Sequence, residues 1–439
     1  MPRSRFYTVG LERQKQQYLK RLYWWSFAIR FSVGMLGWGL VMIEAPIDVV
    51  QDAAFYEEVG WKVATEWLSG EQSETLKILM NRPHFPWLIV VGIGCFYTFT
   101  LGLRILPLLI ATYCAITSFV PGMVYQMTRI TGGGHRAGNL AAWLVVLGPA
   151  FVFWSSALYK EGIIIFFVAH VVLLVMRLQR RFESRLMAWL IVCLIALSAL
   201  RVYLAIIMAL GVGLGLLFVR MGRRSGSSVL IQQLLAVTIL GMMAITAWGL
   251  GQFSEEIPTS LDEGLYQVDD IRRGLSLADS GYLHDTDVSS VSGALESMPE
   301  GLAYFLTVPW PTQRDSLRQI IAIPDTTLWT VLYAFVLLGI GQALSRNPQG
   351  VVVLLACSIG MCCFYAICIG NVGTAYRMRV QVWLLWAPFV GIALEALLPQ
   401  RRAAVARLTR GPSRSMRRQS SATRLVSGPS AIALEGGDA

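Results

Sequence analysis

The chain has 439 residues, of which 55% are hydrophobic and only 15% are charged. A soluble globular domain carries about 25% charged residues, and the mean hydropathy here is +0.55, so the composition excludes an ordinary soluble protein. Lysine and arginine outnumber aspartate and glutamate by 37 to 27, a net charge of +10. The excess lies in short loops and at both ends of the chain. It therefore bears on membrane topology and anionic lipid, and it predicts no nucleic-acid partner.

The basic N-terminus, residues 1–23, is predicted to be cytoplasmic. It holds six cations against one acid and precedes a first apolar segment at 24–43. That segment is too long for a cleavable signal peptide, and basic flanks stay inside. The following stretch, 44–84, holds eight acids against three basic residues. This composition predicts an exterior loop over 44–85.

The rest of the chain alternates between apolar segments and short polar turns. Segments expected to span the membrane lie at about 138–158, 162–177, 185–200, 202–220, 229–250, 327–344, 350–370 and 380–398. Between the fifth and the sixth of these, residues 251–325 hold 13 acids against four arginines, which predicts a second exterior loop. The last 40 residues hold eight arginines among Ser, Gly, Pro and Ala. They predict a basic, disordered cytoplasmic tail over 400–439.

Residues 86–125 complicate the count of crossings. They resemble two apolar helices split at Arg104, whereas the flanking loops require an odd number of crossings. Forty residues cannot hold three spans of about 20 residues each, so one piece is expected to be re-entrant or steeply tilted. The predicted fold is an all-α polytopic bundle over 24–399, with 11 apolar segments, about ten crossings and both termini cytoplasmic.

A first polar cluster follows the first span. Asp48, Asp52 and Tyr56 are spaced i, i+4, i+8, which places all three on one stripe of a helix. An apolar stripe runs beside them, made of Phe55, Val59, Val63 and Trp67. The pattern predicts a helix lying on the exterior membrane surface. A solvated acidic face on such a helix explains the same spacing without any functional role.

Two further clusters are expected at the same exterior face. Lys160 and Glu161 are adjacent at the edge of an apolar span, and Lys160 is one of five lysines in the chain. Arg201 and Tyr203 lie in a tight turn between two other spans. Charges at the membrane edge are costly and are functional hypotheses by default. The alternatives are that Lys160 and Glu161 extend to the interface, and that Arg201 is an interfacial anchor.

The fourth cluster is the strongest local anomaly. Asn371, Gly373 and Thr374 are followed by Arg377 and Arg379, at the start of the last span. Retention of basic residues in the cytoplasm gives no reason for two arginines at the exterior leaflet. The planar, two-pronged guanidinium suits a phosphate group. All four clusters are expected at the exterior face, and we predict that at least two of Lys160, Arg201, Arg377 and Arg379 lie within reach of one another around a single exterior cavity that also contains Asp52.

These motifs resemble the GT-C superfamily of polyprenyl-phosphate-dependent membrane glycosyltransferases. The elements that carry the resemblance are Asp52-Ala-Ala-Phe-Tyr56, Trp67-Leu-Ser-Gly70, Pro83-His-Phe-Pro86, Ala141-Ala-Trp143, Pro149 and Trp154-Ser-Ser156 leading to Lys160-Glu161. The stretches Leu306–Pro311 and Asn371–Arg379 are similar to bacterial envelope-polysaccharide proteins such as O-antigen polymerases. In contrast to many family members, the chain carries Lys-Glu in the second motif and has no large C-terminal exterior domain.

The resemblance implies a GT-C-like fold and a transferase of cell-envelope polysaccharide biosynthesis in the bacterial cytoplasmic (inner) membrane. The donor would be a polyprenyl-phosphate-linked sugar, and the acceptor a glycan or lipid. Asp52 would be the catalytic base, with Glu161 as second choice. The substrate-binding residues would be Tyr56, Lys160, Arg201, Tyr203, Asn371, Arg377 and Arg379. No cofactor is evident, no residue pattern predicts a metal ligand, and a divalent metal stays open.

Two other functions fit the same composition. A transporter or flippase of lipid-linked saccharide would also be a polytopic bundle, but the sequence shows no paired half-repeats with matching broken helices. A non-catalytic subunit of an envelope assembly complex would use the basic tail for docking. If the four clusters line a path through the bilayer, transport is favoured. If they converge on one exterior pocket, catalysis is favoured.

Overall fold

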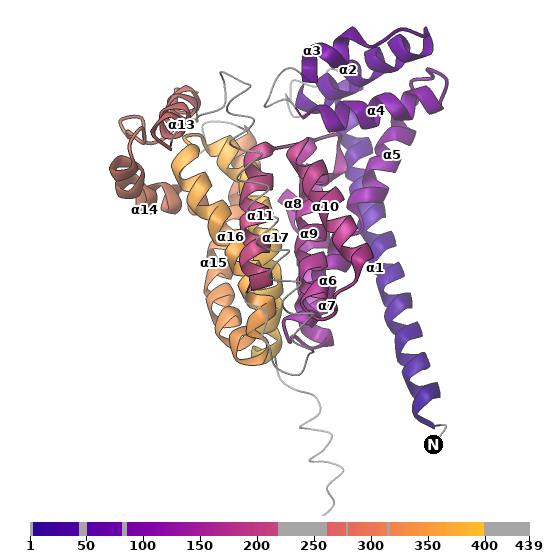
Figure 1. Cartoon of the computed structure of the whole chain (residues 1–439), viewed down its shortest axis with the longest axis vertical. Helices are drawn as coiled ribbons and strands as arrows, with labels where there is room; N and C mark the ends of the chain where they lie inside the picture. The colour runs from indigo at the N-terminus through magenta and orange to yellow at the C-terminus, as the bar shows by residue number, and fades with distance from the viewer. Residues whose placement is uncertain are drawn as a thin grey trace, which may run out of the picture. The chain divides into compact units, whose positions relative to one another are not determined.

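The computed structural model describes residues 3–43, 51–80, 86–217, 261–277, 280–313 and 317–398, with the backbone alone for 3–13, 51, 261–262 and 317–318. Every regular element within these ranges is a helix, and the ranges contain no sheet (Figure 1). The expected all-α class is therefore confirmed. The expected span at 229–250, Asp48 and the cytoplasmic tail lie outside the described residues.

The helices follow one another with short connections. In the first half they are α1 (Arg3–Met42), α2 (Gln51–Leu68), α3 (Glu74–Met80), α4 (Trp87–Phe99), α5 (Leu106–Thr117), α6 (Val120–Ile130), α7 (His135–Leu147), α8 (Pro149–Ser156), α9 (Lys160–Leu178), α10 (Ser184–Ser198) and α11 (Val202–Leu217). In the second half they are α13 (Leu261–Ser276), α14 (Val291–Thr307), α15 (Leu317–Arg346), α16 (Pro348–Cys368) and α17 (Val372–Leu397).

Six stretches of helix are long and apolar enough to cross a membrane. They are Gln14–Met42, Leu106–Ile130, Lys160–Leu178, Gln319–Arg346, Pro348–Cys368 and Val372–Leu397. The pair α7–α8, bent by 56° at Gly148, adds a seventh if it counts as one span. Helices α4, α10 and α11 are apolar but shorter. The chain is thus a multi-pass membrane protein, and the described residues account for six or seven of the ten crossings expected.

The region that complicated the count forms three helices. Arg104 lies between α4 and α5, as expected, but α4 has only 13 residues, whereas α5 and α6 together make one span-length stretch. Helix α4 packs along α2, where Glu57 accepts hydrogen bonds from Arg104 Nε (2.7 Å) and from the Tyr97 hydroxyl (2.5 Å). These contacts hold α4 and the turn that follows it against α2.

The chain divides into two compact units, Met1–Glu395 and Ala396–Ala439. Within the first unit, α9 and α17 are the central helices. The rest of the protein buries 72% of the apolar stretch of each, but only 17% of that of α1. Helix α1 exposes Trp24, Trp25 and Leu36. These large apolar side chains suit contact with lipid. The central helices are consequently the ones that carry the polar residues described below.

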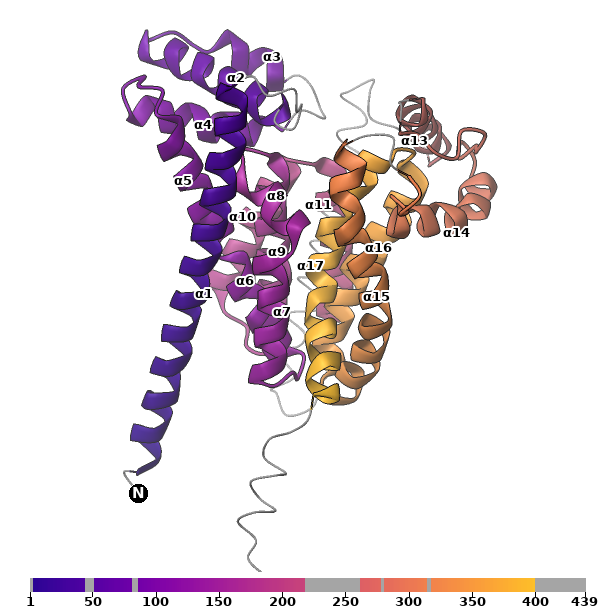
Figure 2. The same ribbon diagram turned by 180° about the vertical axis from the view of Figure 1, so that it is seen from behind.

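Both segments expected outside the membrane lie at one end of this unit. Helices α2 and α3 come from the first, and α13 and α14 from the second. Figures 1 and 2 show α2, α3 and α13 beyond this end of the bundle, with α14 beside the same ends of α15 and α16. An antiparallel bridge joins Gly281 to Asn371 there. The second loop ends earlier than expected, because α15 begins at Leu317 and buries Asp325, which the sequence had assigned to the loop.

Candidate functional site

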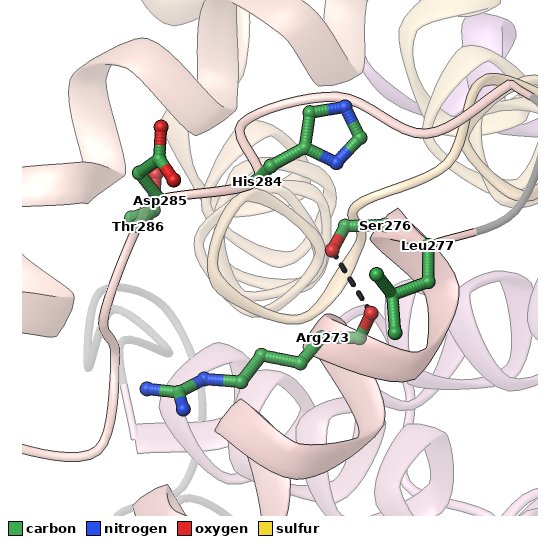
Figure 3. A pocket seen from close by; sticks show the side chains of 6 residues that line it. All are labelled: Arg273, Ser276, Leu277, His284, Asp285 and Thr286. Carbon is green, nitrogen blue, oxygen red and sulfur yellow. Dashed lines mark hydrogen bonds between the residues drawn. The ribbon is translucent and has the colours of Figure 1, made fainter.

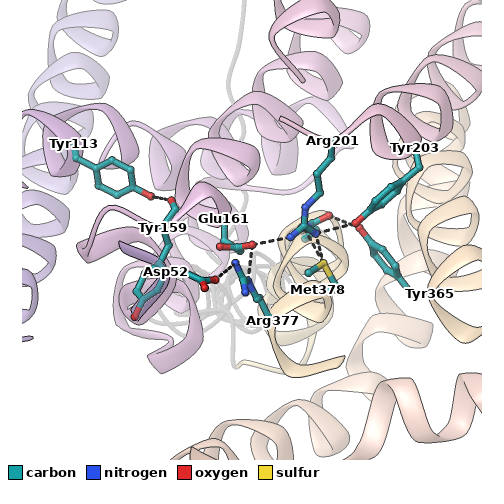
Figure 4. A network of polar contacts seen from close by, with 10 residues as sticks. Asp52, Tyr113, Tyr159, Glu161, Arg201, Tyr203, Tyr365, Arg377 and Met378 are labelled. Carbon is teal, nitrogen blue, oxygen red and sulfur yellow. Dashed lines mark hydrogen bonds and ion pairs between the residues drawn. The ribbon is translucent and has the colours of Figure 1, made fainter. Parts of the chain in front are cut away.

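Four segments that are distant in sequence meet at this end of the protein. Asp52 lies in the first turn of α2, and Lys160 and Glu161 begin α9. Arg201 immediately precedes α11, and Arg377 lies in the second turn of α17. We call these five residues the Glu161 cluster. Figure 4 shows the side chains of Asp52, Glu161, Arg201 and Arg377 pointing toward one another.

Glu161 is the centre of the cluster. Its side chain is fully buried, and its Oε1 atom lies 2.6 Å from Arg377 Nε and 2.7 Å from Arg201 Nη2. The Arg201 side chain is only 7% exposed. A buried carboxylate between two guanidiniums has its charge compensated and holds both cations in fixed positions. Glu161 therefore sets the geometry of the two arginines.

Arg377 connects this buried centre to the surface. Its Nη2 atom lies 2.8 Å from Asp52 Oδ2, and the exposed fraction rises from 20% for the Arg377 side chain to 46% for that of Asp52. The Arg377 guanidinium lies over the Trp154 ring, 5.5 Å from its centroid. A cation on an aromatic face is stabilised by the ring quadrupole. Asp52 is thus the carboxylate that solvent or a substrate reaches.

Tyr56, one turn after Asp52, faces the same cluster. Its side chain is buried. Burial raises the pKa of Tyr56 to about 12, and the negative charges of Asp52 and Glu161 add to the rise. The phenol is therefore neutral and protonated near pH 7. This places Tyr56 beside the two carboxylates, as the i, i+4 spacing predicted.

The start of α9 is held by close packing. The Tyr113 hydroxyl donates to the Tyr159 carbonyl, and Gly162 leaves the room for it: a Cβ there would collide with the Tyr113 oxygen and lie 2.9 Å from Ser155 Cα. Glycine is required here for close approach of another helix and not for an unusual backbone conformation. These contacts fix the position from which Lys160 and Glu161 project.

The cluster carries more positive than negative charge. Lys160, Arg201 and Arg377 are three cations, whereas Asp52 and Glu161 are two anions. Lys160 forms no ion pair within the part of the chain that the structure describes. Two buried polar atoms, Glu161 Oε2 and Trp154 Nε1, also lack a hydrogen-bond partner there. Unsatisfied buried groups of this kind at a charged site are commonly satisfied by a ligand or water.

Two other predicted site residues adjoin the cluster. The Tyr203 hydroxyl accepts a hydrogen bond from Arg201 Nη1 at 3.0 Å, and its ring stacks on Phe364 at 4.7 Å. Asn371 caps α17: its Oδ1 atom accepts from the backbone N–H groups of Gly373 (2.9 Å) and Thr374 (3.2 Å). Side-chain capping satisfies amides that are otherwise unpaired at a helix start. Asn371 Oδ1 therefore serves the start of the helix, while its Nδ2 atom donates to Ser280 Oγ at 2.9 Å.

Arg379 does not join the cluster. It is fully buried and donates to the Val308 carbonyl and to Thr326 Oγ1 (3.3 Å), residues before and within α15. Its guanidinium lies over Trp383, 5.4 Å from the ring centroid. Of the four cations expected around one cavity, Arg201 and Arg377 therefore meet at Glu161, whereas Arg379 lies elsewhere. Residues two apart in a helix point in different directions, and α17 is already helical at both positions.

Asp325 was missed as a structural partner of this region. Although it lies in the middle of α15, it is 2% exposed, and its Oδ2 atom accepts from the Ala150 amide (2.9 Å) and the Tyr376 hydroxyl (3.2 Å). The carboxylate thus holds the start of α8 against α17. A lone acid after a proline, within a segment otherwise apolar enough to cross a membrane, was the signal in the sequence.

The described residues contain no group of three or more His, Cys, Asp and Glu side chains placed to hold a metal ion. The Glu161 cluster instead offers guanidinium and ammonium donors beside one accessible carboxylate. This donor set suits an anionic ligand with hydroxyl groups. No model of a known protein family matches the chain, and no curated protein matches its sequence significantly.

Proposed function

We propose that this chain is a GT-C-like membrane glycosyltransferase that transfers a sugar or glycan from a polyprenyl-phosphate-linked donor to a glycan or lipid acceptor. The reaction would take place at the exterior face of a bacterial cytoplasmic membrane, in assembly of envelope polysaccharide or glycolipid. The observation that carries the proposal is the position of Arg377, which joins buried Glu161 to accessible Asp52.

The proposed reaction needs a base and a cationic site for the leaving group. Asp52 accepts the proton of an acceptor hydroxyl as that oxygen bonds to the anomeric carbon of the donor sugar. The bond between the anomeric carbon and the phosphate oxygen breaks, and the phosphate leaves with the electron pair. Arg377 and Lys160 stabilise the negative charge that develops on it. Fixed cations in a partly dry site make this stabilisation effective.

The contacts favour Asp52 over Glu161 as the base. Glu161 is fully buried between two arginines, which compensate its charge and oppose its protonation. Asp52 has one arginine partner and a side chain that is 46% exposed. A general base must reach the hydroxyl proton by a direct hydrogen bond or through one water. We therefore assign Glu161 to positioning Arg201 and Arg377.

Lipid-linked saccharides of living cells test the proposal. Cells that lack the gene are complemented with wild-type protein, Asp52→Asn or Glu58→Gln, and their lipid extracts are compared by mass spectrometry. Glu58 is exposed on the same helix, so its neutralisation is the matched control. We expect the saccharide intermediate to accumulate in the deletion and with Asp52→Asn, but not with Glu58→Gln. A positioned base contributes about 10²–10⁴-fold in rate. Normal lipid profiles with Asp52→Asn contradict the assignment.

A transporter or flippase of lipid-linked saccharide is the second candidate. The bend of 56° between α7 and α8 favours it, because discontinuous helices form substrate sites in many transporters. The position of the Glu161 cluster at the ends of α9, α11 and α17 favours catalysis instead. Purified protein separates the two: a transferase forms product in detergent with donor and acceptor, whereas a flippase needs a sealed vesicle.

A further inference from the structure

A second group of buried cations lies on another side of α17 and takes no part in the reaction proposed above. Arg272, in α13, is 2% exposed, and Arg379, in α17, is fully buried. Neither forms an ion pair with a carboxylate within the described residues. Tyr282, between α13 and α14, is also buried, and its backbone and that of Arg272 both pack against Gly370. We call Arg272, Tyr282 and Arg379 the Arg272 site.

The unpaired atoms of Arg272 are the ones that recognise oxyanions. Its Nη1 atom donates to the Thr286 carbonyl at 3.2 Å. Its Nε and Nη2 atoms are buried and have no hydrogen-bond partner in the described part of the chain. Nε and Nη2 form the edge of the guanidinium that makes two parallel hydrogen bonds to a carboxylate or phosphate. The structure thus leaves this edge free while fixing the opposite side.

Tyr282 and Arg379 present further donors. The Tyr282 hydroxyl and Arg379 Nε are also buried without a partner among the described residues. Burial raises the pKa of Tyr282, whereas the positive charges of Arg379 and Arg272 act against that rise. The phenol therefore stays a protonated donor. Its ring stacks on Tyr304, with centroids 4.9 Å apart, and its backbone amide donates to the Gly370 carbonyl at 2.8 Å.

Nearby carboxylates do not neutralise Arg272. Asp269 and Glu300 are close enough to act on its charge. However, Asp269 is paired with Arg273 at 2.7 Å and accepts from the Val288 amide at 3.0 Å, and Glu300 makes no ion pair with Arg272. A buried cation without a paired anion is strongly unfavourable. An anionic ligand at this position would remove that cost.

A hollow lies beside Thr286, which contacts Arg272. It has a volume of about 350 Å³ and is lined by Arg273, Ser276, Leu277, His284, Asp285 and Thr286. Figure 3 shows His284, Asp285 and Thr286 facing the end of α13 across it. Thr286, whose carbonyl contacts Arg272, belongs to this lining. The hollow therefore adjoins the segment whose carbonyl holds Arg272 Nη1.

We propose that the Arg272 site binds a phosphate-class oxyanion, held by the free edge of Arg272 and the Tyr282 hydroxyl, with Arg379 as the second positive charge. Two guanidiniums match the charge of about −1.5 to −2 that a phosphomonoester carries near pH 7. A carboxylate carries a single charge and compensates them less well. The site is separate from the Glu161 cluster, and its occupancy does not depend on the reaction proposed for that cluster.

Titration with inorganic phosphate tests this proposal. Full-length protein in an uncharged detergent is titrated at constant ionic strength, with chloride as the balancing anion, and binding is followed by calorimetry and by the thermal midpoint. We expect saturable binding to wild type and at least about tenfold weaker binding to Arg272→Gln. Arg272→Lys should be equally impaired, because an ammonium lacks the two-pronged edge. Absence of saturable phosphate binding to wild type overturns the proposal.

Two variants keep the result interpretable. Arg181→Gln removes the same charge from an 84% exposed side chain outside the site and should leave the affinity within about twofold. If it weakens binding as much as Arg272→Gln, a general surface charge is responsible and the site is rejected. Tyr282→Phe keeps the ring and its stack on Tyr304 but removes the hydroxyl. It should weaken binding several-fold with an unchanged thermal midpoint in phosphate-free buffer.

A second arm distinguishes free phosphate from a lipid headgroup. The protein is placed in phosphatidylcholine nanodiscs with or without phosphatidic acid, which bears a phosphomonoester. Stabilisation by phosphatidic acid that Arg272→Gln abolishes supports a headgroup-accessible site. Stabilisation by inorganic phosphate alone supports a water-borne ligand. Stabilisation of wild type by neither overturns the proposal.

Discussion

Burial decides how much an ion pair of a given length contributes in this protein. The pair between Glu161 and Arg201 and the pair between Glu74 and Lys77 both measure 2.7 Å. The first has side chains that are 0% and 7% exposed, whereas the second is more than half exposed on both sides. Water competes for the second pair and screens it. In the buried pair of Glu161 and Arg201, almost no water reaches either charge, so water does not replace a lost partner.

We therefore expect Glu161→Gln to destabilise the protein by about 3–5 kcal/mol, because Arg201 loses its only carboxylate while staying buried. Glu74→Gln, the same chemical change in the exposed pair, should cost less than about 1 kcal/mol. Thermal unfolding of the purified protein in detergent measures both. Equal midpoints for the two variants would show that the buried pair has no special role in stability.

Arg377 tests whether shape or charge matters at the accessible end of the cluster. Its Nε and Nη2 atoms contact Glu161 and Asp52 at the same time. A lysine keeps the charge but has one nitrogen, so Arg377→Lys should misplace Asp52 and reduce product formation by roughly 10²-fold. Arg181→Lys, at a side chain that is 84% exposed, is the control and should be silent. Near-wild-type activity of Arg377→Lys would mean that charge alone is required.

At the scale of elements, the position of α9 depends on its fit against α5 and α8. Gly162 is the contact point, since a side chain there meets the Tyr113 hydroxyl and the backbone of Ser155. Alanine is otherwise preferred to glycine inside a helix by about 1 kcal/mol. The clash at Gly162 opposes that preference. A side chain there would displace the start of α9, which carries Lys160 and Glu161.

Gly162→Ala should consequently lower both the thermal midpoint and product formation. Gly341→Ala is the matched variant in α15, where an added Cβ meets nothing within 4 Å. It should leave activity unchanged and should not lower the midpoint. Thermal unfolding and product assays on the two proteins check the pair. A Gly162→Ala protein as stable as Gly341→Ala would show that α9 tolerates displacement from α5 and α8.

The sequence predicted elements better than it predicted which side chains share a site. Charge and hydropathy located the apolar segments and the interfacial position of Asp52, since both follow from simple costs of burial in lipid. They also brought Glu161 and Arg201 to the same end. The placement of Arg379 failed because 371–379 was taken as a turn, whereas α17 begins at Val372.

Other contacts join residues that are far apart in sequence, and the local sequence pattern does not predict such pairs. The backbones of Arg272 and Tyr282 both pack against Gly370, which lies far along the chain, just before α17. Asp325 falls in the expected exterior loop because the next apolar segment is expected only at about 327, whereas α15 begins at Leu317. Its two partners, Ala150 and Tyr376, are 175 and 51 residues away in sequence. Contacts at such separations are properties of helix packing, which the local pattern does not encode.

At the scale of the whole protein, orientation in the membrane is the property on which both proposals depend. The Glu161 cluster and the Arg272 site lie at the end that also holds α2 and α13. The acidic composition of 44–84 and 251–325 predicts that this end is exterior. The opposite end holds the turn between α15 and α16, with Arg346, and is predicted to be cytoplasmic.

Labelling of single introduced cysteines measures this orientation directly. Ser69 and Ser292 are exposed at the end predicted to be exterior, and Ser345 is exposed at the other. In a Cys95→Ser background, which removes the exposed native thiol, a membrane-impermeant maleimide should label Ser69→Cys and Ser292→Cys in intact cells. Ser345→Cys should react only after lysis. Labelling of Ser345→Cys alone in intact cells would invert the topology and place the phosphate leaving group, and the Arg272 site, on the cytoplasmic side.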